Sequence, residues 1–503
     1  MKIGVISAGD IQTAKAGEWI LKRGGNAYDA LLSSLLAAPL CEPILTSLGG
    51  GGFMLSCEQG KKPVVYDFFV DVPSKNRENK EFFPIEVDFG TTTQEFHIGA
   101  ASIAVPGMIK GIWKIYQDLC SMPMEEIIQP ALKYAQNGIY ISKIQADFLK
   151  LLEPIFTSTS SSRELYTKNG KLIDETHLFK NPKYADFLVK FAKDGENLFY
   201  EGGIAEEIEH LCNIHNGLID KEILTNYKVE KRDPVSFNYR KYRVYTNPPP
   251  SSGGILIAFS LLLLNELELD KLSHEKYLEA LVEAQKITSK FRQEHIDNFI
   301  HKNNLEAVLD NESILSDFKN SFKKKLNLWG NTTHISVVDS FGNGASCTST
   351  NGEGSGYVLE SCGIMLNNML GEEDLNPHGF FSWKGGLRLP SMMAPTALYK
   401  DGKFDFLLGS AGSNRIRSAI LQTIVNHVDF KMELEKAINS PRVHYEKETV
   451  FLEPPLEIND ISYDIKNFNE FNLFFGGVQA ADSSLNGGAD IRRGASTIIV
   501  KKD

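Results

Sequence analysis

The spacing of apolar residues divides the chain into helices, mostly in its first half, and strands that bracket them. Apolar residues that recur every three or four positions are typical of helices with one buried face, whereas alternation with polar or small residues predicts strands. Helices are predicted at residues 11–21, 27–38, 108–119 and 124–137, with a later helix that Ser273 caps. Strands are predicted at residues 52–57, 64–69, 243–246, 334–339, 345–350, 404–409 and 496–501. These patterns support a mixed α/β class.

Two stretches do not follow these patterns. Residues 255–264 form the longest apolar run, which is about half of a membrane span, so we expect a buried helix there. Residues 294–329 are polar and charged, and this pattern predicts helix fragments and exposed loop. The second stretch is therefore a place where the backbone is open to cleavage.

The most informative residues follow that exposed stretch, where a hydroxyl residue opens an alternating strand. If the bond between Asn331 and Thr332 breaks, Thr332 gains a free α-amine. The reference pKa of that amine, about 7.7–8.0, suits a base for the residue's own hydroxyl. Taken alone, adjacent threonines indicate an ordinary strand, because β-branched residues favour strands. The turn at residues 340–344 changes this interpretation, because a hairpin there places Thr350 near Thr332.

Several collinear motifs accompany this strand. They lie at residues 24–30, 47–53, 105–107, 248–254, 331–339, 409–416 and 490–494. Together they resemble the γ-glutamyltranspeptidase family of N-terminal nucleophile hydrolases over nearly the whole chain. The resemblance implies an α+β fold, a four-layer αββα sandwich in which two interleaved, self-cleaved chains make one domain.

The resemblance also implies roles for particular residues. The family's proenzyme cleaves itself before the first threonine of this strand, which makes Thr332 the nucleophile. The products would be a large subunit, residues 1–331, and a small subunit, residues 332–503. Thr350 is similar to the residue that hydrogen-bonds and orients the nucleophile's hydroxyl. Gly412 and Ser413 match the pair whose backbone N–H groups form the oxyanion hole, so the side chain of Ser413 is expected to matter little.

Other positions depart from the family's pattern in the substrate pocket. Relatives that take glutathione hold the glutamyl α-carboxylate with an arginine, whereas this chain has Phe69 at that position. An aromatic ring cannot pair with a carboxylate as a guanidinium does. The family's tandem serines, which bind the same carboxylate, are Ser391 and Met392 here, so one hydroxyl donor is absent.

The pocket for the substrate's α-amine is altered as well. Asn368 is retained, but Met369 follows where the family has Gln or Glu, and the family's aspartate falls on Glu372. Losing several polar partners should lower affinity for a free glutamyl group strongly. The sequence thus predicts retained acyl-transfer chemistry with an acyl donor that is less polar or lacks the amino-acid head.

The amino-acid composition limits the kinds of partner and cofactor that we expect this protein to bind. The 503 residues carry a formal net charge of −11, which argues against nucleic acid as an obligate partner. The six cysteines form no C-x-x-C pair, so we expect reduced thiols, no zinc site and no cofactor. No signal peptide is visible, and we expect a cytoplasmic protein that does not bind membranes. Its partners would be a small amide substrate and its own two subunits.

Weaker motifs have simpler interpretations. His334 and Asp339 lie an odd number of positions apart on one strand and face opposite sides, so a structural role is expected for His334. The glycines at residues 49–52 precede no Lys-Ser/Thr pair and indicate close backbone packing. Residues 367–395 resemble the family's lid, with a plain surface loop as the alternative.

Three interpretations of function stay open from the sequence. The first is an autoprocessing γ-glutamyltransferase-like hydrolase or transferase. The second keeps fold and nucleophile but acts on a non-glutamyl amide, as an amidohydrolase or acylase. The third is a scaffold without turnover, against which Thr332, Thr350 and Gly412 argue. Phe69 and Met392 favour the second over strict glutathione specificity.

Overall fold

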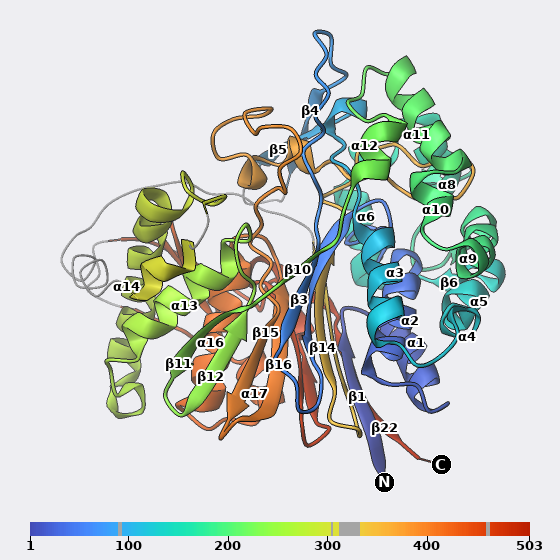
Figure 1. Cartoon of the computed structure of the whole chain (residues 1–503). Helices are drawn as coiled ribbons and strands as arrows, with labels where there is room; N and C mark the ends of the chain where they lie inside the picture. The colour runs from blue at the N-terminus through green and yellow to red at the C-terminus, as the bar shows by residue number, and fades with distance from the viewer. Residues whose placement is uncertain (89–92, 303–304, 311–331, 459–462, 503) are drawn as a thin grey trace.

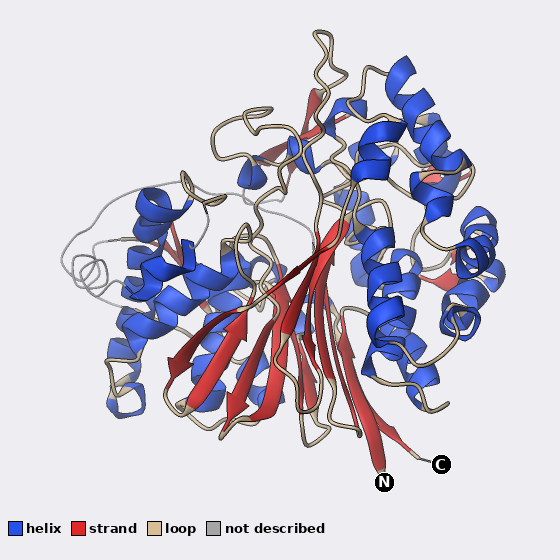
Figure 2. Cartoon of the chain, viewed as in Figure 1, coloured by secondary structure: helices blue, strands red, loops and turns tan. Residues whose placement is uncertain are grey.

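Strands occupy the middle of the molecule, and helices flank them on both sides (Figure 2). The computed structural model describes residues 1–88, 93–302, 305–310, 332–458 and 463–502. The first strand, β1 (Lys2–Ala8), pairs antiparallel with the last, β22 (Ser496–Lys501), so the two ends of the chain lie side by side (Figure 1). The mixed α/β class predicted from the sequence is confirmed.

One large sheet contains the predicted hairpin. Its strands β13 (Thr333–Asp339) and β14 (Gly344–Thr350) pair antiparallel, with Thr333 opposite Ser349. Every residue of both strands is buried, because both faces of the sheet are covered. In the described residues the sheet has the order β10 (Glu230–Arg232), β3 (Val64–Phe68), β2 (Gly51–Cys57), β14, β13, β1, β22.

A second sheet packs against the first, with β13 and β14 facing β16 and β20. Small polar residues join the two sheets: Ser346 Oγ donates to the Leu408 carbonyl at 3.1 Å, and Ser336 Oγ donates to the Gln479 carbonyl at 3.1 Å. Small side chains let the backbones approach closely at this interface. The described strands follow the order β11 (Val235–Tyr239), β12 (Tyr242–Thr246), β15 (Thr396–Lys400), β16 (Lys403–Ala411), β20 (Gly477–Asp482), β21 (Gly487–Ala489).

Helices α1 (Ile11–Leu21) and α2 (Ala27–Cys41) cover the outer face of the first sheet. Side chains cap both helices. Asp10 accepts a hydrogen bond from the Gln12 amide at 2.7 Å. Asn26 and Asp29 form a reciprocal capping box, in which each side chain accepts from the other residue's backbone. These caps fix where the chain enters the two helices beside the hairpin.

The predicted helix at residues 108–119 is confirmed as α3 (Met108–Leu119), but the one at residues 124–137 is divided. The structure has α4 (Met124–Ile127) and then α5 (Gln129–Asn137), with Pro130 in the first turn of α5. Proline lacks the N–H that a helix interior needs and is well suited to a first turn, so a new helix starts there.

Helices α13 (Gly253–Leu264) and α16 (Arg415–Val428) pack against the second sheet, and α14 (His274–Phe291) packs on α13 and on β17 (Val443–Glu446). The predicted buried helix is confirmed, because most of α13 is inaccessible to solvent. Ser273 caps α14 as predicted, by accepting from the Lys276 amide at 3.3 Å. Within the described ranges, none of the helices has both the length and the apolar character needed to cross a membrane.

The remaining elements surround this framework. Residues 367–395 are mostly loop, with the short turns η5 (Met369–Gly371) and η6 (Glu373–Leu375). The other elements that place loops around the sheets are β4 (Phe83–Asp88), β5 (Thr93–Ile98), α6 (Lys143–Leu151), α7 (Glu153–Phe156), α8 (Ser160–Tyr166), α9 (Pro182–Asp194), α10 (Asn197–Tyr200), α11 (Gly203–Ile214), α12 (Lys221–Asn226), α17 (Leu434–Asn439), β17 (Val443–Glu446), β18 (Thr449–Leu452) and β19 (Asp464–Asn467).

Candidate active site

Thr332 lies immediately before β13 and is 5% exposed. Because Thr333 pairs with Ser349, one further step of the register brings Thr332 opposite Thr350, which is 6% exposed. The predicted proximity of these two threonines follows from that register. Residues 311–331, on the other side of the expected cleavage point, lie outside the described residues.

The glycine-rich residues 49–52 bring β2 close to this point. Thr350 pairs with Gly51, and a Cβ added to Gly50 would lie 2.1 Å from the Thr350 carbonyl oxygen. A Cβ added to Gly52 would lie 2.6 Å from the Thr348 carbonyl oxygen. No side chain fits at these distances. Close backbone packing, as the sequence indicated, explains the glycines and fixes Thr350 beside Thr332.

A buried carboxyl group supports the residue after Thr332. Thr333 Oγ1 donates to Glu42 Oε2 at 2.5 Å, and Thr13 Oγ1 donates to Glu42 Oε1 at 2.7 Å. Burial, together with the nearby Asp10 carboxylate, raises the pKa of Glu42 to about 7 against the effect of the two hydroxyls. Glu42 was not predictable from the sequence, because its partner Thr333 lies 291 positions away.

His334 has a structural role in this strand. Its Nδ1 lies 2.7 Å from Thr348 Oγ1, and its Nε2 lies 3.0 Å from Ser336 Oγ. Burial lowers the pKa of His334 to about 3, so the ring is neutral. Asp339 instead accepts hydrogen bonds from the Ala27 and Asn343 amides. The two residues therefore do not form a catalytic pair.

The loop predicted to form the oxyanion hole lies at the Thr332 end of the stacked sheets. Along β16, the Leu408 carbonyl accepts from Ser346, and a Cβ added to Gly409 would meet the His334 ring at 2.2 Å. Ser346 pairs with Ser336, and His334 lies two residues closer to Thr332. The chain thus runs toward Thr332 as it passes from Leu408 to Gly412.

The backbone of this loop is unusual. Gly412 has a φ of +113°, and Ser413 has a φ of +51° in the left-handed region. A Cβ at Gly412 would lie 2.9 Å from the Gly476 Cα, so this position requires glycine. The Ser413 hydroxyl donates to the carboxylate of Asp374. This contact of the Ser413 side chain was not predicted from the sequence, and the expected small importance of the side chain stays a prediction.

The positions of the tandem serines are buried beside α13. Ser391 and Met392 are 4% and 5% exposed, and the Ser391 carbonyl accepts from the Ser252 amide at 2.8 Å. Ser252 Oγ lies 3.5 Å from Met392 Sδ. A small cavity adjoins both residues and is also lined by Ser252, Arg292, Asp297, Ile300, Asp374, Pro377, Trp383 and Pro390.

The predicted amine pocket brings Asn368 and Glu372 together. A Cβ on Gly352 would lie 2.2 Å from Asn368 Oδ1 and 2.6 Å from Glu372 Oε1. The Asn368 side chain is engaged, because it accepts from the Glu353 amide at 2.9 Å. Glu372 Oε1 is buried and has no hydrogen-bond partner among the described residues. Burial and the carboxylates of Glu353 and Asp374 raise the pKa of Glu372 well above its usual value. Met369 is fully buried.

An arginine does reach the position of Phe69, but through the backbone. The Phe69 ring is 1% exposed and stacks on Phe53 with centroids 5.3 Å apart. Its carbonyl accepts from Arg388, whose guanidinium also contacts Asp67 Oδ1 and Asp71 Oδ1, each at 3.2 Å. Arg388 is therefore neutralised by two carboxylates. The position of Arg388 was not predictable from the sequence, because Arg388 and Phe69 are far apart in the chain.

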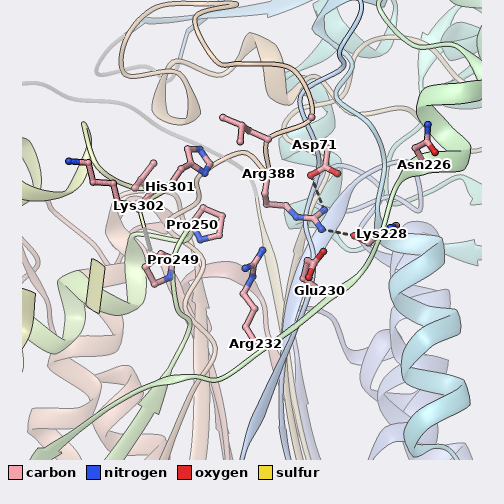
Figure 3. Close-up of a pocket in the computed structure, with 13 residues that line it drawn as sticks. Asp71, Asn226, Lys228, Glu230, Arg232, Pro249, Pro250, His301, Lys302 and Arg388 are labelled. Carbon is pink, nitrogen blue, oxygen red and sulfur yellow. Dashed lines mark hydrogen bonds and ion pairs between the residues drawn. The ribbon is translucent and has the colours of Figure 1, made fainter. Parts of the chain in front are cut away.

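Arg388 lies at the wall of a larger cavity of about 620 Å³ (Figure 3). In this view its guanidinium points toward Asp71 and the backbone of Lys228, whose carbonyl accepts from it at 2.6 Å. Burial raises the pKa of Asp71 to about 6, and Arg388 acts against that rise. Arg388 is thus paired with carboxylates of the protein itself, and a substrate carboxylate would have to compete with them for its guanidinium.

Comparison with known proteins identifies the family of the chain. A model of the gamma-glutamyltranspeptidase family matches residues 13–499. The glutathione hydrolase proenzyme of Escherichia coli (strain K12) is 30% identical over 474 residues, which cover 88% of this chain and 81% of the relative. The acylase ACY 1 proenzyme of Pseudomonas sp. (strain SE83) is 29% identical over 467 residues, covering 90% and 84%. The chain therefore belongs to the γ-glutamyltranspeptidase family.

The fold is similar to that of a solved structure. The crystal structure of cephalosporin acylase from Bacillus halodurans superimposes with a TM-score of 0.87 at 21% identity, covering 100% of this chain and 96% of that chain. Family membership confirms the predicted resemblance and the prediction of an enzyme of the hydrolase and transferase type.

Proposed function

We propose that the chain is a proenzyme that cuts itself between Asn331 and Thr332, and that Thr332 then transfers acyl groups from amides to water or an amine. The placement of Thr332 carries this proposal. It is buried at the start of β13, opposite Thr350 by the strand register, at the end of the sheets where the Gly412 loop lies. The relatives named as proenzymes support it.

The proposed reaction has two steps. The Thr332 hydroxyl attacks the amide carbonyl while its own α-amine takes the hydroxyl proton. The resulting oxyanion is stabilised by the N–H groups of Gly412 and Ser413, and the leaving amine departs with the proton. Water or an amine then attacks the Thr332 ester, and the hydroxyl is restored. Thr350 orients the attacking oxygen from the neighbouring strand.

The two proposed subunits would remain together after cleavage. Each large sheet contains strands from both sides of the cleavage point: β13 lies between β14 and β1, and β12 lies beside β15. We therefore propose one domain from interleaved chains of residues 1–331 and 332–503, with the helix and sheet layers corresponding to the αββα sandwich of N-terminal nucleophile hydrolases.

Two substrate classes follow from the relatives' names, γ-glutamyl compounds and other acyl amides. The neutralised Arg388 favours the second class. Together with the buried Phe69 and with Met392, it leaves the expected carboxylate site with fewer available charges and hydroxyls. A donor with a less polar acyl group fits these surroundings better than a free glutamyl zwitterion.

The test is a panel of γ-glutamyl and simple acyl anilides, incubated with the purified protein and with Thr332→Ala. We expect anilide cleavage that disappears in Thr332→Ala, with higher kcat/KM for simple acyl donors. Cleavage that survives in Thr332→Ala would refute the nucleophile assignment. A clear preference for γ-glutamyl anilides would refute the choice of substrate class and leave the nucleophile intact.

A further inference from the structure

Ser413 combines a demanding backbone with an engaged side chain. Its φ of +51° lies in the left-handed region, which residues with a Cβ avoid because that atom crowds the backbone. A residue keeps such a conformation when its surroundings hold it there. The oxyanion proposal needs this backbone to be held, since the direction of the Ser413 N–H depends on it.

The side-chain carboxylate of Asp374 supplies that restraint. One carboxylate oxygen accepts from the Ser413 hydroxyl, and the other accepts from Asn414 Nδ2 at 3.2 Å. Asp374 belongs to η6 in segment 367–395, whereas Ser413 and Asn414 follow β16. A single carboxylate therefore joins two separate segments at consecutive residues of the loop.

Further contacts hold the other side of the loop. Asn414 Nδ2 also donates to Glu446 Oε1 at 3.2 Å, and Asn414 Oδ1 accepts from Arg292 Nη1 at 3.0 Å. Arg292 in turn pairs with Asp297 at 2.9 Å. These contacts act on Asn414, so Ser413 depends on Asp374 for the contact that its own side chain makes among the described residues.

We propose that Asp374 is a positioning residue for acyl transfer, which holds the Ser413 hydroxyl and thereby aims the Ser413 N–H at the developing oxyanion. The inference rests on the proposed function of Thr332. It adds a dependence of the oxyanion hole on segment 367–395: the hole is complete when Asp374 is in place. Asp374 also lines the small cavity beside Ser391 and Met392, the positions at which the family's tandem serines are expected to bind the substrate carboxylate.

This inference predicts that glycine and alanine differ at position 413. Both substitutions remove the hydroxyl. Alanine retains a Cβ and therefore the steric cost of the left-handed φ, whereas glycine has no Cβ and avoids that cost. Ser413→Ala should therefore disturb the loop and Ser413→Gly should largely preserve it. Asp374→Ala should resemble Ser413→Ala, and it should have little effect when glycine already occupies position 413.

The experiment measures p-nitrophenolate release from p-nitrophenyl acetate, a small ester that reports on the nucleophile and the oxyanion hole. The proteins are wild type, Ser413→Ala, Ser413→Gly, Asp374→Asn, Asp374→Ala and Asp374→Ala with Ser413→Gly, with Thr332→Ala as the background rate. Gel analysis of self-cleavage and thermal unfolding check that each variant folds. Asp374→Asn keeps an acceptor oxygen and serves as the conservative variant.

We expect Ser413→Ala and Asp374→Ala to lower kcat by about 10- to 100-fold with little change in KM, at or below the cost of a lost oxyanion donor. Asp374→Asn should retain more activity than Asp374→Ala, and Ser413→Gly should stay within a few-fold of wild type. An equal loss from Asp374→Ala in both backgrounds would overturn the inference, as would full activity in Ser413→Ala. Wild-type release no faster than Thr332→Ala would instead overturn the proposed function and the inference with it.

Discussion

The region around Thr332 and the region around Phe69 differ in how their polar groups are arranged. Behind Thr332, neighbouring hydroxyl and imidazole groups have buried partners: Thr333 donates to Glu42 at the end of α2, and His334 contacts Thr348 in β14. Around Phe69, an aromatic ring is buried, and the nearby guanidinium of Arg388 is shared by Asp67 and Asp71.

In the proposed function, the reacting residue and the residues that select the substrate are therefore positioned by different parts of the fold. Strand register and glycine packing fix the position of Thr332, and they do not depend on the residue at position 69. The proposed substrate pocket instead draws on loops, where Phe69 and Met392 stand at positions for which the family resemblance implies polar residues. Chemistry can thus be retained while specificity changes.

The largest expected effect comes from removing the proposed nucleophile. Thr332→Ala should remain a single chain and lose turnover of the best anilide by about 10⁴-fold or more, since losing a nucleophile removes the covalent path. Thr332→Ser, which keeps a hydroxyl, is the matched control and should still cleave itself. The measurement is denaturing electrophoresis together with kcat. Normal cleavage in Thr332→Ala would mean that the nucleophile is another residue. The contrast between a reacting region around Thr332 and a selecting region around Phe69 would then no longer hold.

A second large effect is expected at Gly412. Gly412→Ala places a Cβ 2.9 Å from the Gly476 Cα at a φ of +113°, so the loop must shift. Misplacing one oxyanion donor should lower kcat by about 10²–10³-fold. Gly402→Ala is the control, because Gly402 has a φ of +74° but nothing within 4 Å of an added Cβ. Similar kcat losses in both variants would mean that Gly412 matters through backbone strain alone.

The buried carboxyl group behind Thr333 should appear in the pH dependence of stability. The pKa of Glu42 rises from 4.5 to about 7 on folding, so between these values the native state binds more protons than the unfolded state. Its contribution therefore makes the free energy of unfolding fall as pH increases from 4.5 to 7, by a total on the order of 3 kcal/mol. Glu42→Gln cannot ionise and should remove this fall.

The measurement is the free energy of unfolding at pH 5 and at pH 8, for Glu42→Gln and for its parent protein. Both proteins should carry Thr332→Ala, so that each remains one chain. Parallel pH profiles for the two would show that Glu42 has an ordinary pKa in the folded protein.

A smaller effect is expected when the missing polar groups are installed. Phe69→Arg with Met392→Ser should lower KM for a γ-glutamyl anilide. The factor should correspond to a gain in binding free energy on the order of 1.5–3 kcal/mol, as expected for a charge-assisted hydrogen bond. The change should appear mainly in KM, because this contact holds ground and transition states alike. Phe69→Leu with Met392→Ser controls for the lost ring. Thermal unfolding must accompany the kinetics, since a buried arginine can destabilise the protein.

If the unmodified protein already shows a micromolar KM for glutathione, the altered-pocket interpretation is wrong. Arg388 would then be the first residue to examine, because its guanidinium lies against the Phe69 carbonyl.

Local sequence patterns predicted much of the framework. The hairpin around residues 340–344 was predictable because alternation and turn residues are local signals, and α1 was predicted with the bounds that the structure has. The break between α4 and α5 was missed, because the apolar spacing continues past Pro130. Motifs with fixed spacing predicted roles for Thr332, Thr350 and Gly412, and these roles stay predictions.

Residues that act through distant partners were not predictable in this way. Asp374 meets Ser413 from 39 positions away, and Arg388 meets Phe69 from 319 positions away. Neither has a local pattern that distinguishes it from an ordinary charged loop residue. Such pairs depend on how loops from different strands converge, which only the folded chain reveals.

The most direct test of the account is the amino-terminal sequence and intact mass of the purified wild-type protein. The account predicts two chains of 331 and 172 residues, the smaller beginning Thr-Thr-His-Ile-Ser. An intact 503-residue chain that nevertheless turns over anilides, or a cut at any other bond, would contradict the claim that Thr332 is an N-terminal nucleophile.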